Sequence, residues 1–371
     1  MPNVIDLFSG VGGLSLGAAR AGFNVAGAIE IDPHAIGSHS QNFPATMHSD
    51  ISVGELSGNN IADICNLGID EIDGIIGGPP CQGFSIMGKQ DKADERNNLF
   101  GDFFRIVKEV QPRFFLAENV PGILSNKYDS IRNKALDQIA DDYELLAPFK
   151  VKASDYGAPT TRTRVLFIGY KRDQVGSLTQ ESFAPNENTQ QVTVEQALQG
   201  LPVKIDPNWI KEPDGWRRIA RMADSEFSRN IHGIVPENVG HQESIERFDN
   251  NDFVSGCLGT RHTAPVAERY CNLLPGESDK VSRSIRLDMQ GLCPTLRAGT
   301  GSDKGSFQAV RPIHPTEGRV ITPREAARLQ GFPDWFQFHR TKWHSFRQIG
   351  NSVSPILAEN ILHRIYTRIG N

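Results

Sequence analysis

The sequence predicts an α/β protein with a doubly wound, Rossmann-like sheet, and three observations favour this fold class. In the first half of the chain, short apolar runs alternate with helix-like stretches. Each run ends in glycine, proline or a polar residue, as buried parallel strands do. From about residue 171 the alternation is lost, so a second, smaller and loop-rich domain is expected.

The first half supplies the expected sheet. Buried parallel strands are predicted at 4–8, 24–30, 74–77 and 113–118, with a further strand at 165–170. The helices between them are predicted at 14–21, 99–109 and 128–140. Ligands of such a sheet bind at the carboxyl ends of its strands, so the motifs that follow these strands form the candidate site.

The second half has less regular patterning. Residues 171–192 are polar and are interpreted as a linker, and 200–310 are rich in turn residues, with short strands expected. The two expected domains are residues 1–174, completed by 345–371, and residues 175–344.

Clear helical signals return near residue 321. Thr322, Pro323 and Glu325 have the spacing of an N-cap, a first helical residue and a capping box. Gly331 is predicted to end that helix, and a last helix is expected at about 355–369.

Charge and composition limit the classes of protein to which the chain can belong. The net charge is −5, but residues 1–75 hold nine acids and one base, whereas residues 311–371 hold nine bases and four acids. Phosphate binding depends on the local electric field of a cleft, so the net charge argues only weakly against nucleic-acid binding.

No apolar run approaches the roughly 20 residues of a membrane span. The N-terminus also lacks a signal-peptide pattern, so a cytoplasmic protein is expected.

The turn after the first predicted strand, Asp6-Leu-Phe-Ser-Gly10-Val-Gly12-Gly13, favours close approach of a ligand to the backbone. Glu30 ends the next strand, where a carboxylate can accept hydrogen bonds from ribose hydroxyls. A tight turn without a ligand is the alternative. The third glycine of the dinucleotide fingerprint is replaced by Ser15, which disfavours NAD and favours S-adenosylmethionine. Asp50 and Ile51, after a third strand, are expected at the adenine.

Cys81 is the candidate nucleophile. The chain has five cysteines, an odd number without C-x-x-C spacing, so neither structural disulfides nor a metal site is expected. A lone cysteine is most often a small buried hydrophobe. Pro79 and Pro80, however, form a rigid corner at a strand end that presents Cys81, and a reactive cysteine acts as the thiolate.

Two further strand ends carry candidate catalytic groups. Glu118 ends the strand at 113–118, where hydrophobic surroundings would favour the protonated carboxyl. Arg162 and Arg164 alternate, which places both guanidinium groups on one face of a strand. They could hold a carbonyl, a phosphate or a structural carboxylate. A turn-capping role for Glu118 and solvated edge arginines are the alternatives.

Taken together, these motifs resemble the DNA (cytosine-5) methyltransferase family of bacterial and phage type, in its usual motif order. The segment 6–17 is similar to its cofactor loop, Pro79-Pro80-Cys81-Gln82 to its catalytic motif, and Glu118-Asn119-Val120 to its Glu-Asn-Val motif. Arg162 and Arg164 match its Gln-x-Arg-x-Arg motif, with Thr160 in place of the glutamine. Residues 324–333 and 348–353 resemble its last two motifs.

The resemblance implies the roles of individual residues. The catalytic residues are Cys81, Glu118, Arg162 and Arg164. The residues of the S-adenosylmethionine site are Phe8, Ser9, Gly10, Gly12, Gly13, Glu30, Ile31, Asp50, Ile51, Pro79, Leu99, Asn351 and Ser352. The DNA-binding residues are Gln82, Ser85, Lys89, Thr295 and Arg297. Residues 86–98 would be a mobile loop that closes over DNA, and Arg283, Arg286 and Lys304 could read guanines or grip phosphates.

The function implied is methyl transfer from S-adenosylmethionine to carbon 5 of a flipped cytosine in a specific double-stranded DNA sequence, through a covalent Cys81 adduct. The enzyme is expected to act as a monomer without a metal, at the nucleoid when bound to DNA, with a restriction endonuclease as a candidate companion. Residues 175–344 would form the target-recognition domain. The alternatives are a catalytically silent DNA-binding regulator, a tRNA cytosine-5 methyltransferase, and a nicotinamide oxidoreductase, which Ser15 disfavours.

Overall fold

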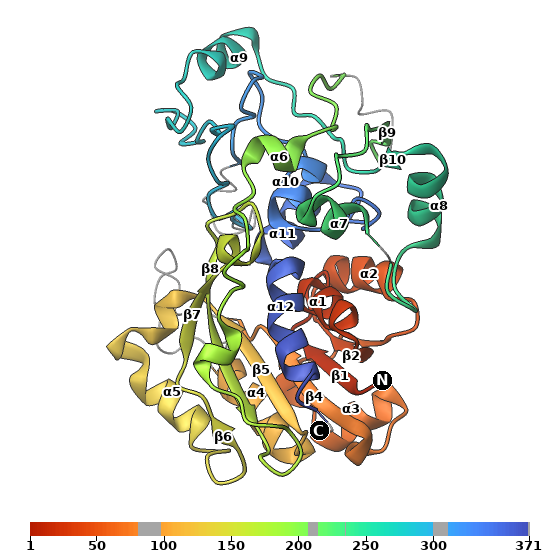
Figure 1. Cartoon of the computed structure of the whole chain (residues 1–371), viewed down its shortest axis with the longest axis vertical. Coiled ribbons are helices and arrows are strands. Elements are labelled where there is room, and N and C mark those ends of the chain that lie inside the picture. Colours follow the sequence, from red (N-terminus) through yellow and green to blue (C-terminus); the bar gives the residue numbers. More distant parts are fainter. Residues whose placement is uncertain (81–97, 207–213, 234, 300–310, 370–371) are drawn as a thin grey trace.

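The computed structural model describes residues 1–80, 98–206, 214–233, 235–299 and 311–369 of the 371-residue chain. Its main feature is one eight-stranded sheet (Figure 1). The strand order is β3 (Met47–Ser49), β2 (Asn24–Ile29), β1 (Asn3–Leu7), β4 (Ile72–Gly77), β5 (Phe114–Asn119), β8 (Thr163–Tyr170) and β6 (Glu144–Leu145), and β7 (Phe149–Lys152) pairs with β8.

The predicted doubly wound sheet is confirmed. The strands from β3 to β5 pair in parallel. β8 pairs antiparallel with β5, β6 and β7, so the sheet is mixed. The chain order reverses between β1 and β4, which makes the carboxyl ends of these two strands the switch point where ligands bind. Because β8 is antiparallel, its amino end lies at the same edge of the sheet.

Alternating side chains of the strands supply two hydrophobic layers. Val4 of β1 packs with α1 (Gly13–Ala21) and α12 (Pro355–Tyr366). Its neighbour Ile5 packs on the opposite face with α3 (Gly58–Cys65) and α4 (Asn98–Val110). A Cβ added to Gly17 of α1 would lie 2.3 Å from Ala358 Cβ, so α1 and α12 pack in direct contact.

The helix predicted near residue 322 forms as α10 (Pro323–Gln330). The Thr322 hydroxyl accepts a hydrogen bond from the Glu325 amide, and the Glu325 carboxylate accepts one from the Thr322 amide, which completes the capping box. Gly331 ends the helix with a φ of 89°.

Several expected boundaries were wrong. The helix expected at 128–140 is α5 (Asp129–Leu136), and turns occupy the residues around Asp141 and Asp142 that follow it. The last helix ends at Tyr366 rather than near residue 369. The strand expected at 4–8 ends at Leu7, because Phe8 has a φ of 62°.

Three helices outside the loop-rich region were missed: α2 (Pro33–Asn42), α3 and α11 (Lys342–Asn351). Few apolar residues mark α2 and α11, and α3 is only eight residues long. The loop-rich region also contains more helix than expected. Its elements are α6 (Val194–Leu198), α7 (Glu226–His232), α8 (Gln242–Asn251), α9 (Ala264–Cys271) and the short strands β9 (Arg217–Arg218) and β10 (Phe253–Val254).

The segment 171–192, expected as a linker, packs against the core. Val175, Leu178 and Phe183 are buried, and the Leu178 carbonyl accepts a hydrogen bond from the Tyr170 hydroxyl. In the described ranges no helix is long and apolar enough to cross a membrane.

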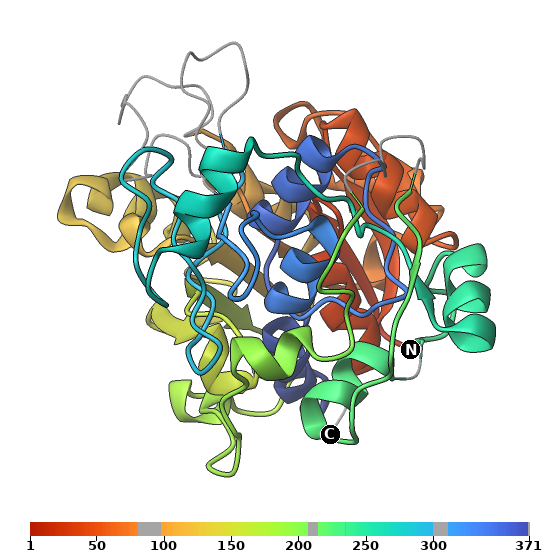
Figure 2. The same ribbon diagram turned by 90° about the horizontal axis from the view of Figure 1, so that it is seen from above.

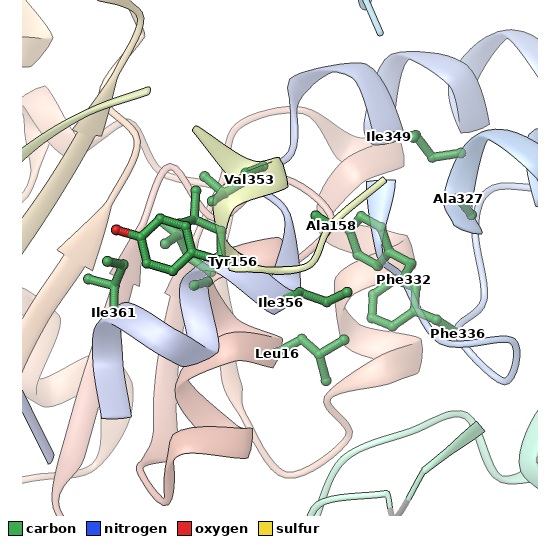
Figure 3. Close-up of a cluster of buried hydrophobic side chains, with 14 of the residues drawn as sticks. Leu16, Tyr156, Ala158, Ala327, Phe332, Phe336, Ile349, Val353, Ile356 and Ile361 are labelled. Carbon is green, nitrogen blue, oxygen red and sulfur yellow. The ribbon is translucent and has the colours of Figure 1, made fainter. Parts of the chain in front are cut away.

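The C-terminal helices join the distant parts of the chain. α6 to α9 lie beyond one end of the sheet, and both termini lie toward the other end (Figure 1). Viewed along the long axis, the blue C-terminal helices occupy the centre of the molecule, beside the red N-terminal segment (Figure 2). Leu16, Tyr156, Phe332 and Ile349 belong to one continuous hydrophobic cluster (Figure 3). The division at residues 174 and 344 remains a prediction.

Candidate active site

The glycine turn between β1 and α1 lies at the switch point of the sheet. Gly10 and Gly12 have φ values of 57° and 99°. A Cβ at Gly12 would lie 2.5 Å from a phenylalanine ring, and one at Gly13 would lie 2.4 Å from the Val353 carbonyl oxygen. A Cβ at Gly10, in contrast, would meet nothing within 4 Å. The turn is therefore tight on its protein side and open at Gly10, where a ligand can approach the backbone.

Glu30, directly after β2, holds this turn. Its Oε2 accepts a hydrogen bond from the Gly10 amide at 2.9 Å, and its Oε1 accepts one from the Asp32 amide at 2.8 Å. Burial raises the pKa of Glu30, and the two amide hydrogen bonds oppose this rise. Each carboxylate oxygen has a second lone pair, so Glu30 can also accept bonds from ligand hydroxyls.

Ser15, which replaces the third glycine of the dinucleotide fingerprint, belongs to a buried polar chain. Its hydroxyl donates to Asp6 Oδ2 at 2.6 Å and lies 2.9 Å from His39 Nε2. His39 Nδ1 in turn lies 2.8 Å from His48 Nε2. Desolvation by burial raises the pKa of Asp6 to about 7 and lowers that of His39. When Asp6 is ionised it accepts the serine proton, and a neutral His39 can then donate from Nε2 and accept at Nδ1 from His48.

The sequence patterns did not predict this chain of four residues. Two histidines on a polar helix and a short strand gave no periodic signal, and only the departure at Ser15 pointed to it.

Exposed apolar side chains adjoin the glycine turn. Ile31 and Ile51 are 60% and 43% exposed, unusual values for large hydrophobic residues. They follow β2 and β3 at the edge of the sheet where ligands bind, as does the exposed Asp50. The Ser9 hydroxyl is buried and has no hydrogen-bond partner among the described residues. Apolar surface and an unsatisfied hydroxyl at one place are features of a ligand site.

Asn119 of the Glu-Asn-Val segment contacts the backbone just before Cys81. Pro79 is buried, and its carbonyl oxygen accepts a hydrogen bond from Asn119 Nδ2 at 3.3 Å. Leu99, half-buried at the start of α4, lies close to Gly54. The predicted residues Cys81, Gln82, Ser85 and Lys89, the segment 86–97 and Lys304 lie outside the described residues.

Glu118 and Arg164 form an ion pair between neighbouring strands. Arg164 Nε contacts Glu118 Oε1, and both side chains are about nine-tenths buried. A Cβ at Gly78 would lie 3.2 Å from Glu118 Oε2, so the second oxygen faces the segment that leads to the cysteine motif. The hydrophobic surroundings expected for Glu118 therefore include a guanidinium group, and Arg164 takes the structural carboxylate that was one of its expected partners.

Arg162 bridges two distant segments. Its Nη1 donates to the Leu296 carbonyl and its Nη2 to the Asn351 carbonyl, each at 3.2 Å. The Nε is buried without a hydrogen-bond partner in the described part of the chain. Burial and the neighbouring Arg164 lower the pKa of Arg162. Thr160, in place of the usual glutamine, accepts a bond from the Arg162 amide and so supports the turn.

The element around Leu296 presents side chains outward. Thr295 and Arg297 are exposed on either side of the buried Leu296. A Cβ at Gly350 would lie 2.6 Å from the Ala298 nitrogen, so α11 packs directly on the backbone of this element.

Asn351 and Ser352 end α11 beside the glycine turn. The Ser352 Cβ lies 3.2 Å from a Cβ built on Gly13, and the Ser352 hydroxyl donates to the Gln348 carbonyl. The structure thus brings these two residues to the predicted cofactor loop.

Two further arginines are bonded to groups within the protein: Arg286, which was a candidate DNA contact, and Arg328, which was not. Arg286 donates to the carbonyls of Cys271, Leu273 and Pro315, so it is not placed to read bases. Arg328, in the segment 324–333, forms a fully buried ion pair with Asp334 at 2.6 Å.

The buried cysteines outside the motif are poor nucleophiles. Burial raises the pKa of Cys65 to about 11 and of Cys257 to about 12, and it raises that of Cys293 further. These thiols remain protonated at neutral pH.

The chain is similar to known proteins along nearly its whole length. The family model for C-5 cytosine-specific DNA methylases matches residues 2–367. The type II methyltransferase M.XorII of Xanthomonas oryzae is 38% identical over 97% of the chain and 83% of its own length. M.DdeI of Desulfomicrobium norvegicum is 35% identical over 98% of the chain and 88% of its own length.

Two solved structures are also similar to this chain. A prophage-encoded E. coli protein described as a DNA modification methyltransferase is 54% identical, with a TM-score of 0.90 over 99% of both chains. The S. pombe Dnmt2 methyltransferase shares the fold at 16% identity, with a TM-score of 0.55 over 97% of this chain and 96% of its own.

Proposed function

Because the chain belongs to the C-5 cytosine-specific DNA methylase family, we propose that it transfers a methyl group from S-adenosylmethionine to carbon 5 of a flipped cytosine through a covalent Cys81 adduct. Methylation of cytosine in DNA is the activity of this family, and the named relatives are type II methyltransferases of restriction-modification systems. The observation that supports the finer proposal is that Glu30, Glu118 and Asn351 lie at one edge of the sheet. Glu118 faces Gly78 there, three residues before Cys81.

The residues at the glycine turn fit S-adenosylmethionine, which supplies an electrophilic methyl group when bound. Glu30 has free lone pairs for the ribose hydroxyls. Ile31 and Ile51 offer the exposed apolar surface that an adenine ring would cover. The buried Ser9 hydroxyl gains a partner when a polar ligand lies on the turn. Asn351 and Ser352 close the site from the end of α11.

The chemistry proposed for Cys81 is nucleophilic catalysis. Carbon 5 of cytosine is a weak nucleophile. Addition of the Cys81 thiolate to carbon 6 forms a carbon–sulfur bond and moves an electron pair onto the ring, so that carbon 5 becomes nucleophilic. After methylation, loss of the carbon 5 proton returns the pair and expels the thiolate. A water held near Pro80 and Asn119 is our candidate for the base.

Glu118 and the two arginines hold the ring during this addition. We assign Glu118 Oε2, the oxygen that faces Gly78, to ring nitrogen 3 and the exocyclic amine. Arg164 fixes Glu118 through Oε1. Arg162 Nε is the donor that we assign to the cytosine carbonyl, since both of its terminal nitrogens already hold backbone carbonyls.

The target atom is inaccessible in a stacked duplex, so the base must leave the helix at a cost of a few kcal/mol. We propose that DNA lies between residues 1–174, completed by 345–371, and the target-recognition domain of residues 175–344. A restriction endonuclease of the same system is the proposed companion.

A Cys81→Ser variant tests the proposal. It should lose methyl incorporation into mixed-sequence DNA and keep its affinity for S-adenosylmethionine, whereas Cys271→Ser, at an exposed cysteine, should stay active. Full activity of Cys81→Ser would refute the covalent scheme. DNA binding by the wild-type chain without any methyl transfer would instead support a silent regulator, and transfer to tRNA alone would support an RNA enzyme.

A further inference from the structure

Arg347 of α11 forms an ion pair with Asp32, two residues after Glu30. Its Nη1 lies 2.8 Å from Asp32 Oδ2, and its guanidinium carbon lies 5.5 Å from the centre of the Trp343 ring, one turn earlier on α11. The Arg347 and Asp32 side chains are 38% and 21% exposed. Since partly exposed ion pairs contribute little to folding stability, the effect of this one depends on the groups that Asp32 contacts.

The backbone of Asp32 connects this ion pair to Glu30. The Asp32 amide donates a hydrogen bond to Glu30 Oε1 at 2.8 Å. The other oxygen, Glu30 Oε2, accepts a hydrogen bond from the Gly10 amide at 2.9 Å. The Glu30 carboxylate is therefore oriented by one bond from the glycine turn and one bond from the residue that pairs with Arg347.

The Asp32 side chain has little freedom to move without Arg347. Its Oδ1 accepts hydrogen bonds from the His34 and Ala35 amides, at 2.9 Å and 3.2 Å, and so caps the N-terminus of α2. Its Oδ2 faces the Arg347 guanidinium. The carboxylate is thus fixed on both oxygens, and because a short side chain follows its backbone, the ion pair also fixes the amide that donates to Glu30.

α11 can act as a support because its contacts with α2 do not depend on Arg347 alone. Gln348, the next residue, donates from Nε2 to the His34 carbonyl at 2.8 Å and to the Ser38 hydroxyl at 2.9 Å. At its other end the helix lies beside the glycine turn, where a Cβ built on Gly13 would be 3.2 Å from Ser352 Cβ. Loss of the guanidinium should therefore leave the two helices packed and release only Asp32.

The charge of Arg347 acts on Glu30 in the same direction as its geometry. Burial raises the pKa of Glu30, the Asp32 carboxylate adds to this rise, and the two amide hydrogen bonds and Arg347 oppose it. Arg347 therefore offsets the repulsion between two carboxylates that lie close together. An ionised Glu30 is a hydrogen-bond acceptor only, which suits ligand hydroxyls.

We propose that Arg347 is a positioning residue of the cofactor site, which acts through Asp32 to hold Glu30 in the orientation that receives the ribose hydroxyls of S-adenosylmethionine. This inference rests on the proposed function, because it takes Glu30 as the ribose ligand. Arg347 acts on the ribose end of the cofactor rather than on the transferred methyl group, so it sets cofactor affinity and not the rate of the chemical step.

The test is calorimetric measurement of affinity on the full chain, with S-adenosylhomocysteine and with its dideoxy analogue, which lacks both ribose hydroxyls. Arg347→Gln removes the charge, and Arg347→Lys keeps it. Asp32→Asn breaks the ion pair but keeps a residue that caps helices well. Arg221→Gln is the matched control, because Arg221 is 44% exposed, pairs with Asp252 at 2.7 Å and lies 4.6 Å from the centre of the Phe248 ring.

Arg347→Gln and Asp32→Asn should each weaken the binding of S-adenosylhomocysteine about tenfold, the effect of one hydrogen bond to a charged group. The double variant should bind no more weakly than either single variant, because both substitutions remove the same link. Arg347→Lys should recover most of the affinity, and Arg221→Gln should match the wild type.

Two further readouts separate positioning from general damage to the site. Binding of the dideoxy analogue should weaken less than about threefold, because the bond to the ribose hydroxyls is already absent. In methylation assays the KM for S-adenosylmethionine should rise by the same factor as the dissociation constant, whereas kcat should stay within about twofold of the wild type.

Wild-type affinity in both Arg347→Gln and Asp32→Asn, or equal losses for S-adenosylhomocysteine and the dideoxy analogue, would overturn the positioning role. Methyl transfer by the wild type is measured alongside. If the wild type methylates DNA and either of these results is found, only this inference fails. If the expected affinities are found but the wild type transfers no methyl group to DNA, the proposed reaction fails and the positioning role stands.

Discussion

The Arg162 side chain donates a hydrogen bond to the backbone carbonyl of Asn351, 3.2 Å away and 189 residues later in the chain. The other terminal nitrogen of the same guanidinium holds the Leu296 carbonyl. One buried side chain therefore ties the exposed Thr295–Arg297 element and the end of α11 to the strand that pairs with Glu118. The proposed cofactor site, the proposed catalytic groups and the Thr295–Arg297 element are all connected through this side chain.

Arg162→Lys should lower kcat/KM for DNA methylation by about 100-fold, the scale of loss expected when a positioned group is displaced by about 1 Å. A lysine carries all its donors on one nitrogen, so it cannot reproduce the planar guanidinium fork whose two terminal nitrogens each hold a carbonyl. The affinity for S-adenosylmethionine should also fall, since the end of α11 loses its support. Steady-state methyl incorporation and calorimetry measure the two effects. Arg172→Lys is the control, because Arg172 is exposed, pairs with Glu144 of β6 and is not required for either effect. Wild-type values for both quantities would contradict the bridging role.

Glu118→Gln should reduce the single-turnover methylation rate by about 10²- to 10⁴-fold, the usual contribution of a positioned proton donor or acceptor. The amide keeps the shape of the carboxyl and loses its ability to give up a proton. Cofactor affinity should change little, because Glu118 faces Gly78 rather than the glycine turn. A rate within twofold of the wild type would exclude Glu118 from the proton chemistry.

Gly350→Ala should destabilise the protein by about 1–3 kcal/mol, as overpacking of a filled interior does. The new methyl group would lie 2.6 Å from backbone atoms of Arg297 and Ala298 and would push the recognition element away. Urea unfolding measures the change, and the KM for DNA should rise with it.

Gly101→Ala is the matched control for this substitution. A Cβ at Gly101 in α4 would meet nothing within 4 Å, so alanine should stabilise the helix by about 0.4–1 kcal/mol. Equal destabilisation by both substitutions would contradict the packing argument.

His314 should make the protein less stable in mild acid. Burial lowers its pKa from the ordinary 6.5 to about 4. The unfolded chain therefore binds a proton between these values that the folded protein does not, and stability falls as pH drops through this window. One such group contributes up to about 1.4 kcal/mol per pH unit.

His314→Asn offers the matched comparison, since an amide oxygen can accept the bonds that Nδ1 receives from the Thr316 and Glu317 amides. Its unfolding free energy should decline less steeply between pH 6.5 and 4.5 than that of the wild type. Parallel declines would show that His314 is not responsible.

Much of the fold followed from local patterns. Val4 and Ile5 alternate between two hydrophobic layers, and the glycines after β1 mark a turn that tolerates no side chains at Gly12 and Gly13. The capping box at Thr322 is a short-range signal, and it formed as predicted. Such features depend on residues a few positions apart, which a single sequence displays.

The missed features depend on partners far apart in the chain. Nothing near Arg162 signals that Leu296 and Asn351 will accept its hydrogen bonds. His39 joins the Ser15 network from a helix with few apolar residues, so periodicity did not mark it. The antiparallel pairing of β8 placed Arg164 against Glu118, an ion pair that strand patterns alone could not specify.

The most direct test of the account is covalent trapping at Cys81. The protein is incubated with S-adenosylmethionine and a cognate duplex that contains 5-fluorocytosine, whose fluorine cannot leave as a proton does. Peptide mass spectrometry should find the DNA attached to the Cys81 peptide, and the Cys81→Ser variant should give no adduct. If the wild type methylates ordinary cytosine but never forms this adduct, or if the DNA is attached to another residue, Cys81 is not the nucleophile.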